Sequence, residues 1–251
     1  SAPSVDLTQL EAGLERVLPG QTFAEQRDAV RLAAGQLTTI LVGGPGTGKT
    51  TTVAGLLALL SEQIETQTGV RPQIALCAPT GKASARLQEA IDEATANFQD
   101  PKDRDRVAKL EAQTMHRLLG PMGKSNRFRH DRTNRLPHDV IVVDEASMMP
   151  LTMMARLMEA IRDDTRLVFV GDADQLSSVE AGAVLADLVA GLHGVHPSPV
   201  ASLRTTHRYG AQIGALAQAL RDSDADQVIE ILSAGQLEVQ WIKPDDSAAL
   251  E

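Results

Sequence analysis

Gly43-Gly44-Pro45-Gly46-Thr47-Gly48-Lys49-Thr50 is the stretch that decides the fold. Four residues separate its first and last glycines, and Lys-Thr follows, which is the full spacing of a phosphate-binding loop. A β-branched run at 38–42 precedes it, and a helical segment from 49 to about 65 follows. An incidental Gly-rich turn would lack this setting, in which glycine N–H groups and the positive helix end surround phosphate oxygens. The chain is therefore expected to bind a nucleoside triphosphate.

The acidic half of such a site is expected where an apolar run, Val140–Val143, ends in Asp144 and Glu145. Ligand sites of parallel α/β sheets lie at the carboxyl ends of the strands. Asp144 is suited to hold Mg²⁺, directly or through water, and Glu145 to polarise an attacking water. Taken alone, the two acids are equally well explained as caps of the next helix. Together with the glycine loop, they favour a hydrolytic site.

Apolar strands alternate with amphipathic helices along the chain, which predicts an α/β fold with a parallel sheet sandwiched by helices. The expected strands are 38–42, 73–78, 140–143, 166–170, 200–203 and 237–242. The expected helices are 8–18, 24–34, 49–65, 82–94, 114–119, 151–161, 181–192, 211–220 and 225–233. The methionines at 148, 149, 153, 154 and 158 are expected to fill the core.

Composition narrows the class of protein. Of the 251 residues, 43% are hydrophobic and 2% are aromatic, so aliphatic side chains must supply the core. No apolar run approaches the roughly 20 residues that cross a bilayer. The start of the chain lacks the features of a signal peptide. One cysteine, Cys77, excludes an internal disulfide framework. A cytoplasmic location is expected.

The net charge of −9 argues mildly against indiscriminate binding to nucleic acid, but it hides a local reversal. Between 117 and 135 there is one acidic residue, Asp131, and there are six basic ones: Arg117, Lys124, Arg127, Arg129, Arg132 and Arg135. Such a run is either a solvated loop or a contact for polyanions. Its one aromatic, Phe128, provides no row of base-stacking platforms.

Seven stretches, in order and at matching spacing across roughly residues 20–220, resemble superfamily 1 DNA helicases, and within them the RecD-like group. They are Phe23-Ala24-Glu25-Gln26-Arg27, the loop 43–50, Cys77-Ala78-Pro79-Thr80-Gly81-Lys82-Ala83, Thr114-Met115-His116-Arg117-Leu118-Leu119-Gly120, Asp144-Glu145-Ala146-Ser147-Met148, Gly171-Asp172-Ala173-Asp174-Gln175-Leu176, and His207-Arg208-Tyr209-Gly210. The resemblance implies a P-loop NTPase fold of the RecA-like type.

The nucleotide site implied by the loop and the resemblance has defined members. Nucleotide contacts are expected from Gln26, Gly44, Gly46, Thr47, Gly48, Lys49, Thr50 and Thr51. Lys49 should reach the β- and γ-phosphates, while Thr50 and Asp144 should hold Mg²⁺. By resemblance, Gln26 reads adenine, Gln175 touches the γ-phosphate and Arg208 is an arginine finger. Without the resemblance, Gln26 would be a surface residue, and Arg208 or nearby Arg204 a member of a surface ion pair.

DNA contacts are expected on two further stretches. Thr80, after Pro79, precedes a helix whose N-terminus can hold a phosphate, with Lys82 adding charge. Thr114 and His116 resemble a second strand-contacting motif, although an isolated histidine is more often structural. The second stretch lies next to the basic run 117–135, which favours a nucleic-acid role for that run.

The expected organisation is N-terminal helices at 1–36, a RecA-like motor domain at 37–221 with a basic insertion at 117–138, and the start of a truncated second domain at 222–251. The expected function is ATP hydrolysis by the first motor domain of a DNA helicase in recombinational repair, with single-stranded DNA as partner and 5′-to-3′ polarity implied by resemblance. Nuclease and helicase subunits of a heterotrimer, as in exodeoxyribonuclease V, are further expected partners. Alone, the chain is expected to hydrolyse ATP poorly and not to unwind DNA.

Two alternatives stay open. One is a P-loop ATPase without a nucleic-acid substrate, and the other is a nucleotide-dependent protein-binding module. Glu145 and Gln175 disfavour the module, because a protein that never turns over has no use for them. A dinucleotide-dependent dehydrogenase is excluded, because Lys49-Thr50 and Asp144-Glu145 have no role in that fold.

Overall fold

The computed structural model describes residues 3–123, 127–173, 175, 184–192, 194–205, 211–221 and 223–234. The chain forms two compact units, one of Ser1–Gly44 with Gly48–Arg204, the other of Pro45–Thr47 with Thr205–Glu251. The domain boundaries drawn from the sequence stay predictions. Among the described residues, no helix combines the length and the apolar character that a membrane span requires.

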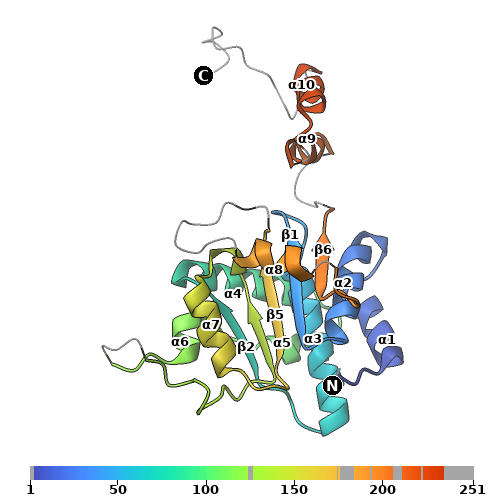
Figure 1. The fold of residues 1–251 in the computed structure, drawn as a ribbon. Coiled ribbons are helices and arrows are strands. Elements are labelled where there is room, and N and C mark those ends of the chain that lie inside the picture. The colour runs from blue at the N-terminus through green and yellow to red at the C-terminus, as the bar shows by residue number, and fades with distance from the viewer. Residues whose placement is uncertain are drawn as a thin grey trace. The chain divides into compact units, whose positions relative to one another are not determined.

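The first unit is built on a parallel sheet whose six strands have the order β3-β2-β4-β5-β1-β6 (Figure 1). In chain order the strands are β1 (Thr38–Gly43), β2 (Ile74–Ala78), β3 (Ala112–Thr114), β4 (Val140–Val143), β5 (Arg166–Gly171) and β6 (Val200–Leu203). Every residue of β4 and β5 is buried, as is typical of parallel strands covered on both faces. The predicted α/β class and parallel sheet are confirmed.

Alternate strand residues face two separate hydrophobic clusters. On one face, Leu41, Val142 and Val168 pack against the first five α-helices of the chain. These are α1 (Leu7–Val17), α2 (Ala24–Ala34), α3 (Lys49–Thr68), α4 (Gly81–Ala96) and α5 (Pro101–Val107). On the other face Ile141 and Phe169 pack against α6 (Met115–Leu119), α7 (Leu151–Ala160) and α8 (Val184–Leu192). Short 3-10 helices occur at η1 (Gln21–Phe23) and η2 (Ala146–Met148). The sheet therefore lies between two helical layers, as predicted.

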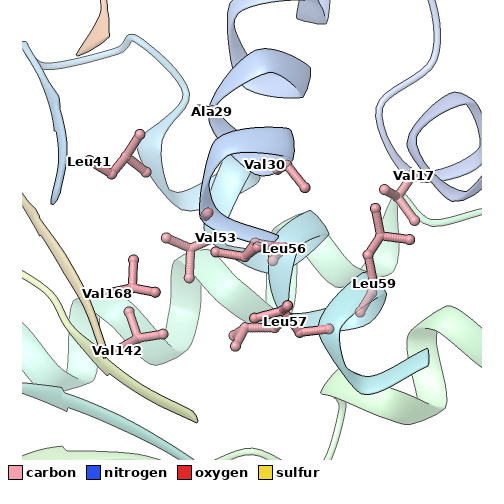
Figure 2. Close-up of a cluster of buried hydrophobic side chains, with 14 of the residues drawn as sticks. Val17, Ala29, Val30, Leu41, Val53, Leu56, Leu57, Leu59, Val142 and Val168 are labelled. Carbon is pink, nitrogen blue, oxygen red and sulfur yellow. The ribbon is translucent and has the colours of Figure 1, made fainter. Parts of the chain in front are cut away.

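The helix α3 is the centre of the first layer, with eleven buried residues spread around it. Val53, Leu56 and Leu57 of α3 lie against the strand residues (Figure 2). On the other side of α3, helix α1 approaches so closely that a Cβ on Gly13 would lie 2.4 Å from Leu59 Cδ2. The N-terminal helices α1 and α2 therefore pack on the core.

An ion network joins α1 to α3 and α5. Asp103 has no exposed surface, and its carboxylate accepts hydrogen bonds from Arg16 Nε at 2.5 Å and Arg106 Nη1 at 2.9 Å. Arg16 also donates to Glu62 Oε2 of α3 at 2.8 Å. The charged stretch 97–111 contains α5, whose acids and bases find partners on neighbouring helices.

The second unit contains α9 (Ala211–Arg221) and α10 (Ala225–Ser233), close to the predicted helices. Helix α10 begins at an N-cap, Asp224, whose carboxylate accepts from Gln227 N–H at 3.0 Å. None of the residues of α10 is buried. The predicted strand 237–242 lies outside the described residues.

Candidate functional site

The glycine loop has the backbone that its sequence demands. Gly46 and Gly48 have φ of 77° and 85°, in the left-handed region that residues with a Cβ rarely adopt. Gly48 is the N-cap of α3, and its carbonyl accepts from both the N–H and the Oγ1 of Thr52, each at 2.9 Å. The loop therefore connects the end of β1 directly to the start of α3. The first backbone N–H groups of α3, which have no acceptor within the helix, lie at this loop.

Lys49 and Thr50 occupy the first turn of α3, and both are half-buried, as is Thr51. The Lys49 ammonium donates to the carbonyl oxygens of Gly43 at 2.6 Å and Gly44 at 3.1 Å. These bonds hold the charge over the end of β1, where a phosphate chain along the loop would meet it. Thr47 of the same loop is buried.

Gln26, the residue expected to read adenine, is fully buried on the first turn of α2. Its side chain lies directly against the loop, because a Cβ built on Gly48 would be 3.1 Å from Gln26 Nε2. The structure thus brings Gln26 and Gly48 of the glycine loop together, although they are 22 residues apart in the sequence. Gln26 is therefore not on the surface, where a glutamine of a helix usually lies. Its contact with adenine stays a prediction.

Asp144 and Glu145 follow β4 at the same edge. Asp144 N–H donates to Cys77 O at 2.8 Å, which fixes the end of β4 beside β2. The pKa of Asp144 is raised to about 6, chiefly by burial. Of the smaller effects, the hydrogen bond from the Glu145 backbone N–H lowers this pKa, the charge of Glu145 raises it, and the Lys49 ammonium lowers it. The interaction with Lys49 places this carboxylate within electrostatic reach of the loop.

Glu145 has φ 51° and ψ 40°, a left-handed conformation that is rare and strained for a residue with a Cβ. Such strain persists where the surrounding structure imposes it, and here the Glu145 carbonyl accepts from Met148 N–H at 3.0 Å to begin η2. Asp144 and Glu145 therefore do not simply cap a long helix, since η2 spans three residues and α7 begins only at Leu151.

Strand β5 lies between the loop strand β1 and the acidic strand β4. Its end approaches η2 so closely that a Cβ on Gly171 would lie 2.7 Å from Leu185 Cδ2 and 3.3 Å from Ser147 N. Gln175, exposed beyond that strand, accepts a hydrogen bond at Oε1 from Ser147 Oγ at 3.1 Å. Gln175, the residue predicted to contact the γ-phosphate, is thus hydrogen-bonded to the segment that carries Asp144 and Glu145.

Arg208 lies outside the described residues, as does Asp174. Arg204 is described and exposed, and its backbone N–H donates to Glu25 Oε2 at 2.8 Å. Neither Glu25 nor Ser147 was among the predicted site residues. Their partners are 179 and 28 residues away in the sequence, so no local pattern signals these contacts.

The stretches expected to contact DNA follow two paired strands, in which Ala78 is opposite Thr114. Exposed Thr80 caps α4 by accepting from Ala83 N–H at 3.1 Å, and Thr114 caps α6 by accepting from Arg117 N–H at 3.2 Å. Lys82 and His116 are exposed, and Pro79 is half-buried. The structure therefore places all five predicted residues at the carboxyl ends of β2 and β3. Their contact with DNA stays a prediction.

The basic insertion is held by an antiparallel bridge between Pro121 and Phe128, and the Phe128 ring lies 5.9 Å from that of His116. Arg132 pairs with Glu159 of α7, and Arg135 donates to the carbonyls of Glu159 and Ile161. These two arginines therefore stabilise the insertion itself. A pocket of about 350 Å³ lies beside them, lined by Met122, Arg127, Phe128, His130, Asp131, Arg156 and Glu159.

Comparison with known proteins identifies the family. A family model described as "AAA domain" matches residues 26–181, which include the glycine loop, both acids and Gln175. The chain belongs to this AAA-domain family. Its predicted RecD-like character is confirmed by relatives named "RecBCD enzyme subunit RecD", of which the protein of Mycolicibacterium smegmatis is 59% identical over 227 residues, covering 90% of this chain and 40% of the relative.

Other members of the comparison are more distant. An "ATP-dependent RecD2 DNA helicase" of Deinococcus radiodurans is 36% identical over 190 residues, covering 75% of this chain and 22% of that protein. The large terminase of the HK97 bacteriophage superposes with a TM-score of 0.52 at 16% identity, covering 92% of this AAA-domain chain and 52% of that one; this likeness shows the fold alone. The chain spans about 40% of the length of the RecD relatives from Mycolicibacterium smegmatis and Mycobacterium tuberculosis.

Proposed function

We propose that this chain is the ATP-hydrolysing motor domain of a DNA helicase that moves 5′ to 3′ along single-stranded DNA in recombinational repair. The observation that carries the proposal is that the Lys49 ammonium, held on the loop after β1, lowers the pKa of Asp144 at the strand end after β4, so the two charges lie within electrostatic range. A lysine ammonium within range of a partly buried carboxylate, next to a helix N-terminus, is what a magnesium–triphosphate complex requires. The names of the RecD and RecD2 relatives support the choice of DNA as the substrate.

The residues present fit ATP with Mg²⁺. Gly46 and Gly48 hold the left-handed backbone that opens N–H groups to phosphate oxygens, and Lys49 is already held at the loop. The Thr50 hydroxyl and the Asp144 carboxylate are the oxygen ligands that would hold Mg²⁺, which when bound neutralises charge on the β- and γ-phosphates. The raised pKa of Asp144 is the electrostatic cost of a partly buried anion, and a bound cation would offset it.

Glu145 takes the role of the general base. Its carboxylate accepts a proton from the attacking water while Lys49 binds the phosphate oxygens that gain charge. Gln175 contacts the γ-phosphate, Gln26 pairs with the adenine edge and Arg208 stabilises charge on the transferred phosphoryl group.

Thr80, Lys82, Thr114 and His116 form the proposed DNA contact. They lie at the carboxyl ends of the neighbouring strands β2 and β3, at the same sheet edge as the nucleotide site. ATP hydrolysis and DNA binding would therefore take place at the same edge of the sheet. The RecD relatives are named as RecBCD subunits, which supports a heterotrimer with nuclease and helicase subunits as the working assembly of this chain.

The deciding experiment is ATP turnover with and without oligo-dT, with Lys49→Ala as control. We expect stimulation by oligo-dT and a loss of about a hundredfold or more in Lys49→Ala, because the lysine stabilises charge that develops in the transition state. Turnover that ignores oligo-dT would instead mean a P-loop ATPase with another substrate. Tight nucleotide binding without turnover, in this chain and in any longer protein that contains it, would mean a binding module.

A further inference from the structure

Ser147 touches a residue of the proposed site without belonging to the glycine loop or to the acid pair. It lies in η2, two residues after Glu145, and its exposed fraction is 7%. Its Oγ donates to Gln175 Oε1 at 3.1 Å. A buried hydroxyl that reaches an exposed side chain 28 residues away calls for an explanation, because serine hydroxyls usually bond to nearby backbone.

The backbone around Ser147 holds this contact in place. The left-handed conformation of Glu145 turns the chain directly into η2. On the other side, β5 approaches closely at Gly171, where a Cβ would lie 3.3 Å from Ser147 N and 2.7 Å from Leu185 Cδ2, so a side chain there would require η2 or Leu185 to shift. The Gln175 N–H donates back to Asp172 O at 3.4 Å, which begins the turn after β5. The segments that follow β4 and β5 therefore meet at the Ser147 hydroxyl.

The observed orientation of the contact leaves one end of the Gln175 amide facing away from Ser147. A carboxamide has one acceptor end and one end with two donors. Because Ser147 donates to Oε1, the acceptor end is engaged and both Nε2 hydrogens are available to another group. A γ-phosphate oxygen can only accept, so this orientation is the one that lets glutamine bind it. A freely rotating amide would present the wrong end half of the time.

We propose that Ser147 is a positioning residue that orients the Gln175 amide with its N–H groups toward the γ-phosphate and so links that contact to the Asp144–Glu145 segment. The inference rests on the proposed function, which supplies the phosphate. It assigns a role to a serine that could otherwise be regarded as a simple packing residue of η2. Ser147 itself touches neither ATP nor the attacking water in this scheme.

The test compares Ser147→Ala with Ser147→Thr, which keeps a hydroxyl, and with Ser61→Ala, which removes a buried hydroxyl from the middle of α3. Single-turnover hydrolysis at saturating ATP gives the rate constant, and a non-hydrolysable ATP analogue gives the dissociation constant. We expect Ser147→Ala to lower the rate constant about tenfold with less than a twofold change in analogue binding. Ser147→Thr should restore most of the rate, and Ser61→Ala should leave it unchanged.

Two further measurements show whether the effect passes through Gln175. In the double variant Ser147→Ala with Gln175→Ala, the rate should equal that of Gln175→Ala alone, since the hydroxyl has nothing left to orient. The side-chain amide resonance of Gln175, assigned by its absence in Gln175→Ala, should shift in Ser147→Ala and not in Ser61→Ala.

The outcomes separate this inference from the function on which it rests. A wild-type rate in Ser147→Ala, additive losses in the double variant, or an unmoved Gln175 resonance would each overturn it. Failure of the proposed function would appear differently, as wild-type turnover no greater than that of Lys49→Ala. The resonance would still report whether Ser147 holds the amide in that case, because it requires no hydrolysis.

Discussion

Asp144 shows how a site residue can act against the stability of its own fold. Its pKa is raised to about 6 from 3.8, chiefly by burial. The folded state therefore binds the proton more tightly than the unfolded chain does. The resulting contribution to stability is fully present below pH 3.8 and is lost as the pH rises through about 6. At neutral pH the carboxylate is ionised, and the fold retains it at a cost.

Asp144→Asn is therefore expected to stabilise the protein in the absence of metal and nucleotide while abolishing hydrolysis. The gain in the free energy of unfolding should be on the order of 1–3 kcal/mol at pH 8 and close to zero near pH 4. Urea denaturation at both pH values, with EDTA present, measures it. Asp105→Asn is the control, because the pKa of Asp105 is lowered by Arg71 and its loss should not stabilise. Equal gains at both pH values would contradict the electrostatic cause.

Gly48 tests the contact between the glycine loop and Gln26. Gly48→Ala meets two penalties, a φ of 85° and a Cβ 3.1 Å from Gln26 Nε2, whereas Gly69→Ala meets only a φ of 73° with open space around it. We expect Gly69→Ala to lower stability by about 1 kcal/mol, and Gly48→Ala by about 1–3 kcal/mol. Only Gly48→Ala should also weaken binding of an ATP analogue. Thermal unfolding and analogue titration check both; equal behaviour of the two variants would mean that the Gln26 contact is unimportant.

At this scale the sequence predicted well what is local and poorly what is distant. The loop spacing and the apolar run before Asp144 are continuous patterns, so they could be read without a structure. The burial of Gln26 against Gly48, and the hydrogen bond from Ser147 to Gln175, join segments whose proximity depends on strand order. The methionines illustrate the same limit: Met149 and Met154 are buried as predicted, but Met148 and Met158 are 44% and 47% exposed, so core filling was wrong for those two.

Among the elements, β4 and β6 have the predicted bounds, because apolar runs bounded by turns define a buried strand. The strand β3 was missed, since its three residues, Ala112–Thr114, are too few for a period and all are only half-buried. The helix α5 was missed because it has almost no hydrophobic period: only Asp103 and Val107 are buried in it, and ion pairs hold it in place. Elements held by tertiary ion pairs carry little hydrophobic pattern for a sequence to display.

The ion network of α5 makes a quantitative prediction. Removing the carboxylate in Asp103→Ala leaves Arg16 and Arg106 without a partner they share in a buried site. Because Arg16 keeps Glu62 and Arg106 keeps Glu65 as partners, we expect a loss of about 1.5–3 kcal/mol in the free energy of unfolding. The control is Asp28→Ala, which removes an exposed carboxylate paired with Arg31 and should change little. A similar small change in both variants, measured by urea denaturation, would show that the hydrophobic contacts of α1 and α5 suffice.

For the whole molecule, the sequence predicted the class of fold but not the order of the strands. Helices between successive strands indicate a parallel sheet covered on both faces. They do not indicate that β5 separates the loop strand from the acidic strand, nor that β2 and β3 pair at one side. Strand order determines which site residues are neighbours. The position of β5 explains why the Gln175 turn lies beside η2 and why a Cβ at Gly171 would crowd Leu185 and Ser147.

Helix α1 buries one face in the core around α3 and exposes another. Leu14 has no exposed surface and belongs to the cluster around α3, while Leu7 is 69% exposed on the same helix. Leu14→Ala should lower the free energy of unfolding by about 2–5 kcal/mol through a cavity, and Leu7→Ala should not. Urea denaturation of both variants measures this. If α1 also binds a partner subunit, Leu7→Ala should weaken co-purification at unchanged stability, because its side chain contributes surface rather than core. If Leu14→Ala proved as stable as wild type, α1 would be a peripheral helix, and deletion of residues 1–20 would then report on partner binding alone.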